Sequence, residues 1–484
     1  MRTLACLFAL GALLVAGCGG SPKPVPVSHF SGPAAPRRST AAERQSVAIT
    51  VYNQNFGLVR EVRRTDVGVG KISLEFRDVA ARIQPATVHV KSLTKASALS
   101  VFEQNYRYDL LSPQKLLEKY VDKKVKVIRV NEATGREEET EAEVLSTEGG
   151  AVLRMPQGIT YGFPGRIAFP EVPQNLIAKP TLVWLMESTI AKQDLEVTYI
   201  TGNLNWEADY VLVVNDADTA GDLTGWVTLT NKSGASYENA ALKLVAGDVQ
   251  RLADDDEGER DHDAILDEER PRRESFKEEG LFEYHLYALE RPTSILDNEQ
   301  KQVTLLEAEG IHLEKHLIFQ GGSEYYRRNV AAPASAKVAV YLYIQNRETN
   351  HLGMALPKGV LRVYKADKSG AKQFIGEERI DHTPRDEEIR VKLGDAFDVV
   401  SERRRMDWKA QGTCASESSW EVSLRNHKDE AVEVEVREPV EGDWTILSSS
   451  QAFTKKDSRT FVFNVKIAAR GETKLTYRVR TRWC

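Results

Sequence analysis

Apolar and polar residues alternate along most of the chain, and the alternation is clearest near the C-terminus. Val432, Val434 and Val436 are separated there by glutamates. A period of two predicts β-strands with one buried and one exposed face, as the sheets of a sandwich require. We therefore predict an immunoglobulin-like β-sandwich over residues 411–484. Three further runs carry the same pattern: Trp420, Val422 and Leu424; Phe461, Phe463, Val465 and Ile467; Leu475, Tyr477 and Val479.

Two other parts of the chain show the same alternation. Val47, Ile49 and Val51 begin a predicted N-terminal β region at residues 46–111. Residues 173–410 are also rich in alternating segments and are predicted to form a central β-sandwich region.

The segment Asp66–Lys71 separates two of the predicted N-terminal strands. Its glycines, Gly68 and Gly70, match part of a dinucleotide-binding fingerprint. The third glycine of that fingerprint is missing and no helical pattern follows. We therefore interpret the segment as a hairpin turn and not as a phosphate-binding loop.

A short helix is predicted after Ser112, because serine is a favourable N-cap and Pro113 fits the first helical position. Short strands separated by turns follow. A short helix that leads into such strands resembles a small SH3-like or Sm-like barrel, which we place at residues 112–172. The predicted fold class is therefore mainly β: a multi-domain β-sandwich protein with this inserted barrel and a C-terminal immunoglobulin-like sandwich.

The composition is typical of a folded, water-soluble protein. The chain has 484 residues, of which 41% are hydrophobic and 28% charged, and this length suffices for two to four domains. The formal net charge is -6 with both signs mixed along the chain, which argues against a nucleic-acid partner. Acidic residues are concentrated in residues 251–279, where apolar residues are scarce. We interpret this stretch as a disordered, solvated loop.

The first seventeen residues have the pattern of a secretory signal peptide. A basic residue precedes an apolar run from Leu4 to Val15, which is too short for a permanent membrane span. Cys18 follows, and the segment resembles the lipobox of bacterial lipoproteins. The resemblance implies cleavage of residues 1–17 and lipidation of Cys18, which anchors the protein to a membrane. Residues 18–45 are rich in proline and small residues and are interpreted as a tether.

Cysteine usage is compatible with an oxidising compartment. Of the four cysteines, Cys6 lies in the signal peptide and Cys18 is the lipidation site, which leaves Cys414 and Cys484. These two can form a disulfide, and two free thiols are the alternative. They meet at one end of the sandwich if an even number of antiparallel crossings separates them, which depends on whether residues 444–447 form a strand.

Residues that are suited to catalysis are sparse. Asp381 and His382 place a carboxylate beside an imidazole, as in the orienting half of a nucleophilic triad, but no nucleophile motif accompanies them. His285 lies among aromatic residues, as in a packed strand. These three residues are the candidate site if the protein is an enzyme. His312 and His316 have the spacing of metal ligands on a helix, but their neighbours predict strands, where this spacing is ~13 Å, so no metal site is predicted.

Many sequence blocks, spread over most of residues 46–483, match one family. The chain resembles the bacterial domain-of-unknown-function family that is often labelled mucoidy-inhibitor-A-like. The resemblance implies a β-rich bacterial envelope protein and transfers no established activity or catalytic residue. The blocks include Asn205–Tyr210, Leu244–Val249, Tyr284–Tyr287, Asp381–Pro384 and Gly394–Asp398.

We therefore expect a non-catalytic, lipid-anchored envelope protein that binds or scaffolds another envelope component, either a protein or a polysaccharide. Gly19 after the lipidated cysteine resembles the outer-membrane sorting pattern of Gram-negative lipoproteins, which implies the periplasmic face of that membrane. Tyr325 and Tyr326 beside Arg327 are expected to be exposed and to suit a polar or glycan surface. No cofactor is expected. The alternative is an envelope hydrolase or metal enzyme that depends on histidine and carboxylate residues.

Overall fold

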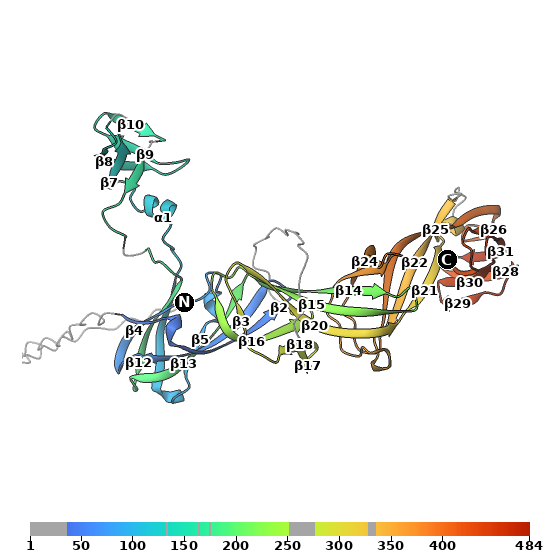
Figure 1. The fold of residues 1–484 in the computed structure, drawn as a ribbon, viewed down its shortest axis with the longest axis horizontal. Coiled ribbons are helices and arrows are strands. Elements are labelled where there is room, and N and C mark those ends of the chain that lie inside the picture. The colour runs from blue at the N-terminus through green and yellow to red at the C-terminus, as the bar shows by residue number, and fades with distance from the viewer. Residues whose placement is uncertain (1–35, 132–133, 163–164, 174–175, 251–275, 328–334) are drawn as a thin grey trace, which may run out of the picture.

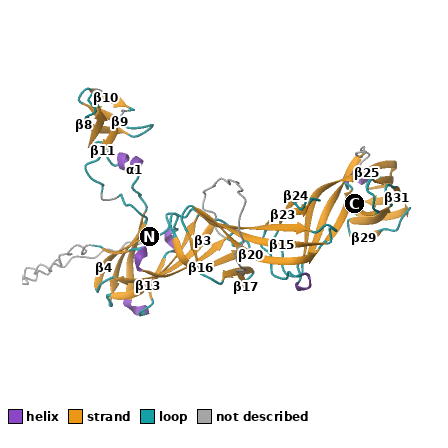
Figure 2. Cartoon of the chain, viewed as in Figure 1, coloured by secondary structure: helices purple, strands orange, loops and turns teal. Residues whose placement is uncertain are grey.

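The computed structural model describes residues 36–131, 134–162, 165–173, 176–250, 276–327 and 335–484. It contains 65% strand and 5% helix, which confirms the predicted mainly β, multi-domain fold. The molecule is elongated, with the N-terminal sheets at one end and the C-terminal sandwich at the other (Figure 1), and its helices are few and short (Figure 2). The predicted signal peptide, Cys18 and the predicted tether up to residue 35 lie outside the described residues, as do residues 251–275 of the predicted acidic loop.

Two sheets pack face to face at the N-terminal end, where the Arg63 guanidinium lies 3.5 Å from the centre of the Phe76 ring of the opposite sheet. The smaller sheet has the order β1 (Arg37–Ser39), β4 (Gly70–Arg77), β12 (Thr181–Ser188) and β6 (Leu99–Arg107). The larger has the order β17 (Phe276–Leu281), β18 (Tyr284–Leu289), β16 (Tyr237–Ala246), β2 (Arg44–Tyr52), β3 (Phe56–Asp66), β13 (Lys192–Gly202) and β5 (His89–Ser92), with β19 (Thr293–Ile295) paired to β16. The short 3-10 helices are η1 (Ala41–Glu43), η2 (Pro85–Thr87), η3 (Ala96–Ala98) and η4 (Glu348–Asn350).

The structure differs from the sequence prediction at two points in this region. The turn after Asp66 does not form a hairpin, because β3 and β4 belong to different sheets and bury their apolar faces against each other instead of pairing. Residues 276–279 of the predicted acidic loop lie in β17, which pairs with β18. The hydrogen bonds of that ladder and the buried Phe276 account for the ordered strand there.

A five-stranded sheet forms the middle of the molecule. Its order is β20 (Glu299–His312), β15 (Ala220–Asn231), β14 (Leu204–Val214), β23 (Gly359–Ala366) and β24 (Lys372–Ile380), with β14 and β23 parallel. His312 ends β20, and His316 lies in the next strand, as the strand interpretation of this segment predicts.

The inserted small unit has its own hydrophobic core, which includes Tyr120, Val127 and Leu153. It begins with α1 (Pro113–Glu118), whose N-cap Ser112 accepts a hydrogen bond from the Lys115 amide at 3.1 Å, as predicted. Its antiparallel sheet has the order β10 (Gly158–Tyr161), β9 (Val152–Met155), β8 (Glu137–Ser146), β7 (Lys124–Val130) and β11 (Arg166–Ala168).

The C-terminal end is a nine-stranded sheet whose strands enclose one hydrophobic core. It contains strands that precede residue 411, so its core includes Leu317, Phe319, Tyr326, Val338 and Val399 as well as residues after 411. One further helix, α2 (Glu324–Arg327), packs against it. The order is β28 (Asp443–Ser449), β31 (Glu472–Arg482), β26 (Ala415–Asn426), β25 (Glu388–Ala410), β22 (Ser335–Gln345), β21 (Glu314–Gln320), β27 (Val432–Pro439), β30 (Thr460–Ile467) and β29 (Thr454–Asp457).

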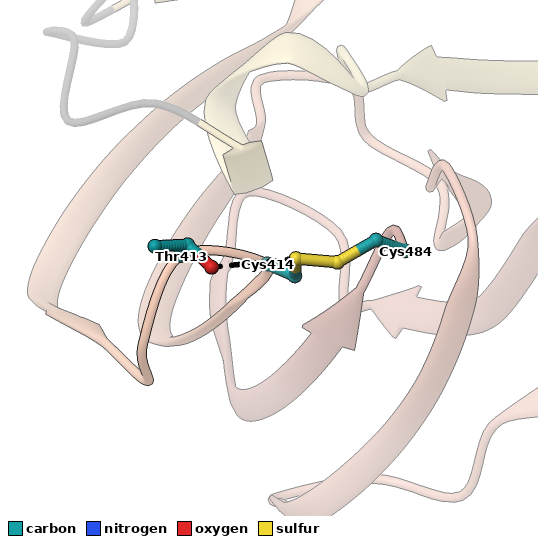
Figure 3. The surroundings of a disulfide bond; sticks show 3 residues. All are labelled: Thr413, Cys414 and Cys484. Atoms are coloured by element: carbon teal, nitrogen blue, oxygen red, sulfur yellow. Dashed lines mark hydrogen bonds between the residues drawn. A yellow bond between two sulfur atoms is a disulfide. The ribbon is translucent and has the colours of Figure 1, made fainter.

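Cys414 and Cys484 are joined by a disulfide (Figure 3). Cys414 precedes β26 and Cys484 follows β31, and these strands are antiparallel neighbours. The ends of the two strands therefore lie together, with the cysteine Cα atoms 5.5 Å apart. Residues 444–447 do form a strand, since they lie within β28.

Candidate functional site

Three of the sequence blocks that carry the family resemblance meet beside the end of β16. His285 on β18 is paired with Ala246 on β16, and His382 lies in the segment after β24. Asp248, two residues beyond Ala246, lies 3.4 Å from the Lys358 ammonium, and the Lys358 amide in turn donates a hydrogen bond to His382. The structure therefore brings the two candidate histidines into one neighbourhood, together with Asp248 and Lys358.

Both ring nitrogens of His382 are engaged by the protein. Nδ1 accepts a hydrogen bond from the Lys358 amide at 3.2 Å, so the proton of the neutral ring is on Nε2. Nε2 lies 3.4 Å from the side-chain amide of Asn53, whose oxygen is buried with no hydrogen-bond donor among the described residues. We assign the Asn53 amide so that its oxygen accepts the Nε2 proton, because an amide N–H facing the Nε2–H would set two donors against each other. Burial, and then the Lys358 charge, lower the pKa of His382 and keep the ring neutral.

Asp381 does not orient a histidine. Its side chain is exposed, and its backbone carbonyl accepts a hydrogen bond from the Thr383 hydroxyl at 2.9 Å. The orienting carboxylate is instead Glu278 on β17, whose Oε1 lies 2.8 Å from His285 Nδ1. Glu278 Oε2 accepts a hydrogen bond from the Ala355 amide at 3.0 Å, which fixes the carboxylate. The sequence argument missed Glu278, because the residue lies in the segment that was interpreted as a loop.

The placement of side chains in the described residues gives no support to the alternative of a metal enzyme. Within the described residues, no three His, Cys, Asp or Glu side chains gather as a metal site would need. His316 packs against the Tyr343 ring, with the ring centres 4.3 Å apart, and lies 3.4 Å from Glu314. His312 is exposed at the end of its strand.

A cleft of about 370 Å³ lies where the five-stranded and nine-stranded sheets meet. Strand β24 passes close to β25 there, because Gly376 has no side chain: a Cβ atom at this position would lie 2.7 Å from the Leu393 carbonyl oxygen. The walls are mainly aliphatic, and the rim carries equal numbers of positive and negative side chains. The aliphatic lining is Val214, Leu317, Val340, Leu342, Ile375 and Leu393, and the charged lining is Asp218, Asp395, Asp398, Lys315, Lys365 and Lys428.

Phe397 lines this cleft from a bulge in β25. Lys337 of β22 pairs with Val400 and Ala339 pairs with Asp395, so a single residue of β22 opposes four residues of β25. Such a bulge re-aims side chains that a regular strand would point elsewhere. The Phe397 side chain is 94% exposed, and the His427 amide holds the bulge by a 2.7 Å hydrogen bond to the Asp398 carbonyl.

Ion pairs hold the polar rim of the cleft. Asp218 accepts hydrogen bonds from Lys315, at 2.6 Å, and from Lys365. Burial raises the pKa of Asp218, but the two lysines outweigh burial and hold this pKa below its ordinary value. Asp218 therefore stays ionised near neutral pH and keeps both lysines paired.

The prediction that Tyr325 and Tyr326 are both exposed is wrong in part. Tyr326 is fully buried on α2, with its hydroxyl 2.7 Å from Glu438 Oε2 and its ring 5.5 Å from that of Trp420. Arg327 forms an ion pair with Glu441. Helical spacing turns these neighbouring residues in different directions, so one tyrosine enters the core of the sandwich.

The comparisons with known proteins identify a family but no activity. No curated protein matches the chain, and no helix in the described residues is long and apolar enough to cross a membrane. A family model described as "Domain of unknown function (DUF4139)" matches residues 195–484. This match includes His285, His382, the cleft and the disulfide, so the chain belongs to the DUF4139 family.

Proposed function

We propose that the protein is a non-catalytic, lipid-anchored protein of the bacterial envelope, on the periplasmic face of the outer membrane, that binds another envelope component in the Phe397 cleft. The observation that carries the proposal is the 94% exposure of Phe397 at an aliphatic cleft. Covering this ring with a partner removes its apolar surface from water, which favours binding, and aromatic residues are enriched among the side chains that dominate interface energies.

The lining of the cleft favours one kind of partner. Aliphatic walls with a balanced charged rim fit a protein segment that inserts an apolar side chain between charged neighbours. A polysaccharide, which the resemblance to mucoidy-inhibitor-A-like proteins suggests, is recognised mainly through hydrogen bonds and aromatic faces, and Phe397 supplies one such face. We therefore propose a protein partner first and a polysaccharide second.

The test is a photo-cross-linking side chain placed at residue 397 of the lipidated protein in its native envelope, with cross-linked species identified by mass spectrometry. Residue 374 is the matched control, because Phe374 is also exposed, at 55%, but does not line the cleft. We expect one species that cross-links from 397 and not from 374. In pull-downs without cross-linking, we expect Phe397→Ser to retain at least tenfold less of that species than the parent. Equal cross-linking from both positions contradicts the proposal.

One observation favours the enzymatic alternative. The His285–Glu278 pair is an imidazole oriented by a fixed carboxylate, and His285 Nε2 contacts no other hydrogen-bonding group of the described residues. Such a pair can act as a general base toward a water molecule. If the protein is a hydrolase, Glu278→Gln lowers its rate by about 100-fold or more, whereas Glu279→Gln on the same strand leaves it unchanged. Equal effects of the two substitutions contradict a base role.

A further inference from the structure

Three turns meet at the end of the N-terminal sheets that is distant from the C-terminal sandwich (Figure 1). They are residues 67–69, 93–98 and 189–191. The Val67 amide donates a 2.8 Å hydrogen bond to the Ala191 carbonyl, and the Thr189 amide donates a 3.0 Å bond to the Ala98 carbonyl. We call these turns, with the adjoining Val101 and Phe102 of β6, the apolar tip.

Large apolar side chains on this tip face water. Val69 is 67% exposed, Phe102 52% and Leu93 47%. Phe102 is the extra residue of a bulge in β6, since Glu103 pairs with Leu185 of β12 and Val101 with Met186. The three side chains come from turns and a strand end that the hydrogen bonds above tie together, so they lie at the same end of the N-terminal sheets.

Positive charge surrounds the patch. Lys71, Lys95 and Lys192 are exposed, and none of them has a carboxylate partner among the described residues. The Lys71 ammonium lies 5.9 Å from the Phe102 ring. The other charged groups of the tip are mostly paired, as Arg37 with Asp66, Arg64 with Asp194 and Lys91 with Glu196. Two exposed carboxylates, Glu187 and Glu103, then stand against the three lysines.

The polypeptide enters the fold beside this patch. Arg37 at the start of β1 reaches Asp66 with its guanidinium at 2.9 Å, next to the turn that carries Val69. Because β1 is parallel to β4, and β4 begins at Gly70, the chain comes from the side of the tip. Cys18 precedes Arg37 by 19 residues, a contour of at most about 65 Å.

We propose that the apolar tip docks into the interface of an anionic phospholipid membrane beside the lipid anchor. Val69, Leu93 and Phe102 enter the boundary between headgroups and acyl chains, and the unpaired lysines contact anionic headgroups. The lipid on Cys18 holds only the N-terminus at the membrane, through a tether, so a second, protein-borne contact fixes the orientation of the folded part. This inference rests on the proposed function in one respect: the protein faces a membrane.

The test measures sedimentation of the unlipidated Cys18→Ala chain, produced from residue 18 onward so that the apolar run Leu4–Val15 is absent, with phosphatidylglycerol vesicles and with phosphatidylcholine vesicles. We expect binding to the anionic vesicles, at least tenfold weaker binding by Val69→Asp/Phe102→Asp, and about fivefold weaker binding for each lysine changed to glutamate. Phe374→Asp is the matched control, since it also places an aspartate at an exposed phenylalanine, but on β24, far from the tip (Figure 1). Unchanged near-ultraviolet circular dichroism confirms that each variant is folded.

Three results overturn the inference: no binding to either vesicle, equal binding by the double variant and the parent, or self-association of the chain that Val69→Asp abolishes, which assigns the tip to a second copy. The anchoring part of the proposed function fails separately. In that case mass spectrometry of the envelope protein finds Cys18 without lipid, while vesicle binding by the unlipidated chain is unaffected.

Discussion

The buried charge cluster of the C-terminal sandwich offers the sharpest test of the described packing. Glu438 is fully buried and accepts hydrogen bonds from the hydroxyls of Tyr326 and Tyr477, both at 2.7 Å, and from Arg403 at 2.9 Å. The Arg403 guanidinium also lies 3.7 Å from the centre of the Trp420 ring. Every polar group of the cluster thus depends on the one carboxylate.

Glu438→Gln removes the negative charge and leaves the Arg403 guanidinium buried without a counter-ion. Breaking a buried pair in this way costs about 3–5 kcal/mol, because the remaining charge keeps its desolvation penalty. Changing both partners, in Arg403→Met/Glu438→Leu, removes that penalty. We therefore expect the double variant to lose less unfolding free energy than Arg403→Met and Glu438→Leu lose in sum. The expected difference is about 2 kcal/mol or more.

The assay is hydrogen exchange of peptides from β26 and β31, followed by mass spectrometry. These strands carry Trp420 and Tyr477 of the cluster, and their exchange reports local as well as global opening. Glu402→Gln is the matched control: Glu402 bonds to the exposed Arg404 at 2.7 Å, and we expect a loss of less than about 1 kcal/mol. A loss of that small size for Glu438→Gln, or strict additivity in the double variant, refutes the reasoning.

Three further predictions concern separate features. Cys414→Ser opens a loop of sequence separation 70 and lowers the unfolding free energy by about 4 kcal/mol in urea titrations under oxidising conditions, and the difference from the parent disappears with reductant. The pKa of His382 is lowered in the fold, so its stabilising effect is complete above the unfolded value of about 6.5 and is lost as pH falls below it. His382→Gln should therefore flatten the pH dependence of unfolding between pH 7.5 and 5. Ser112→Ala removes the α1 N-cap and costs about 1 kcal/mol, measured by thermal unfolding of the small unit.

The fold was largely predictable where one face of each strand is buried. Val432, Val434 and Val436 have a period of two that a buried sheet face imposes, and the helix after Ser112 follows from its own capping chemistry. Strand pairing was not predictable in the same way. The residues around Gly68 suit a tight turn whether the flanking strands pair or pack face to face, and only the distant partners β12 and β13 decide between these.

The candidate site shows the same limit. Asp381 and His382 are neighbours in sequence, but the orienting carboxylate comes from Glu278, whose relation to His285 depends on the β17–β18 ladder. The Phe397 bulge had a weaker local signal. Gly394 interrupts a strand pattern and Phe397 stands among polar residues, which together indicate an irregular strand with an exposed aromatic residue.

The two proposed contacts lie on one continuous hydrophobic core. Val67 at the apolar tip and Leu342 in the wall of the cleft belong to the same buried cluster, which extends through β2, β14 and β23. Bending between the tip and the cleft has to break close-packed contacts in that core. A tip held at a membrane therefore keeps the cleft at a fixed distance from it. The small unit has a separate core and is joined by two connecting segments, so its position is not set in this way. We therefore expect distances between spin labels on β4 and β23 to be narrowly distributed and unchanged by vesicles, and distances from either strand to β8 to be broad.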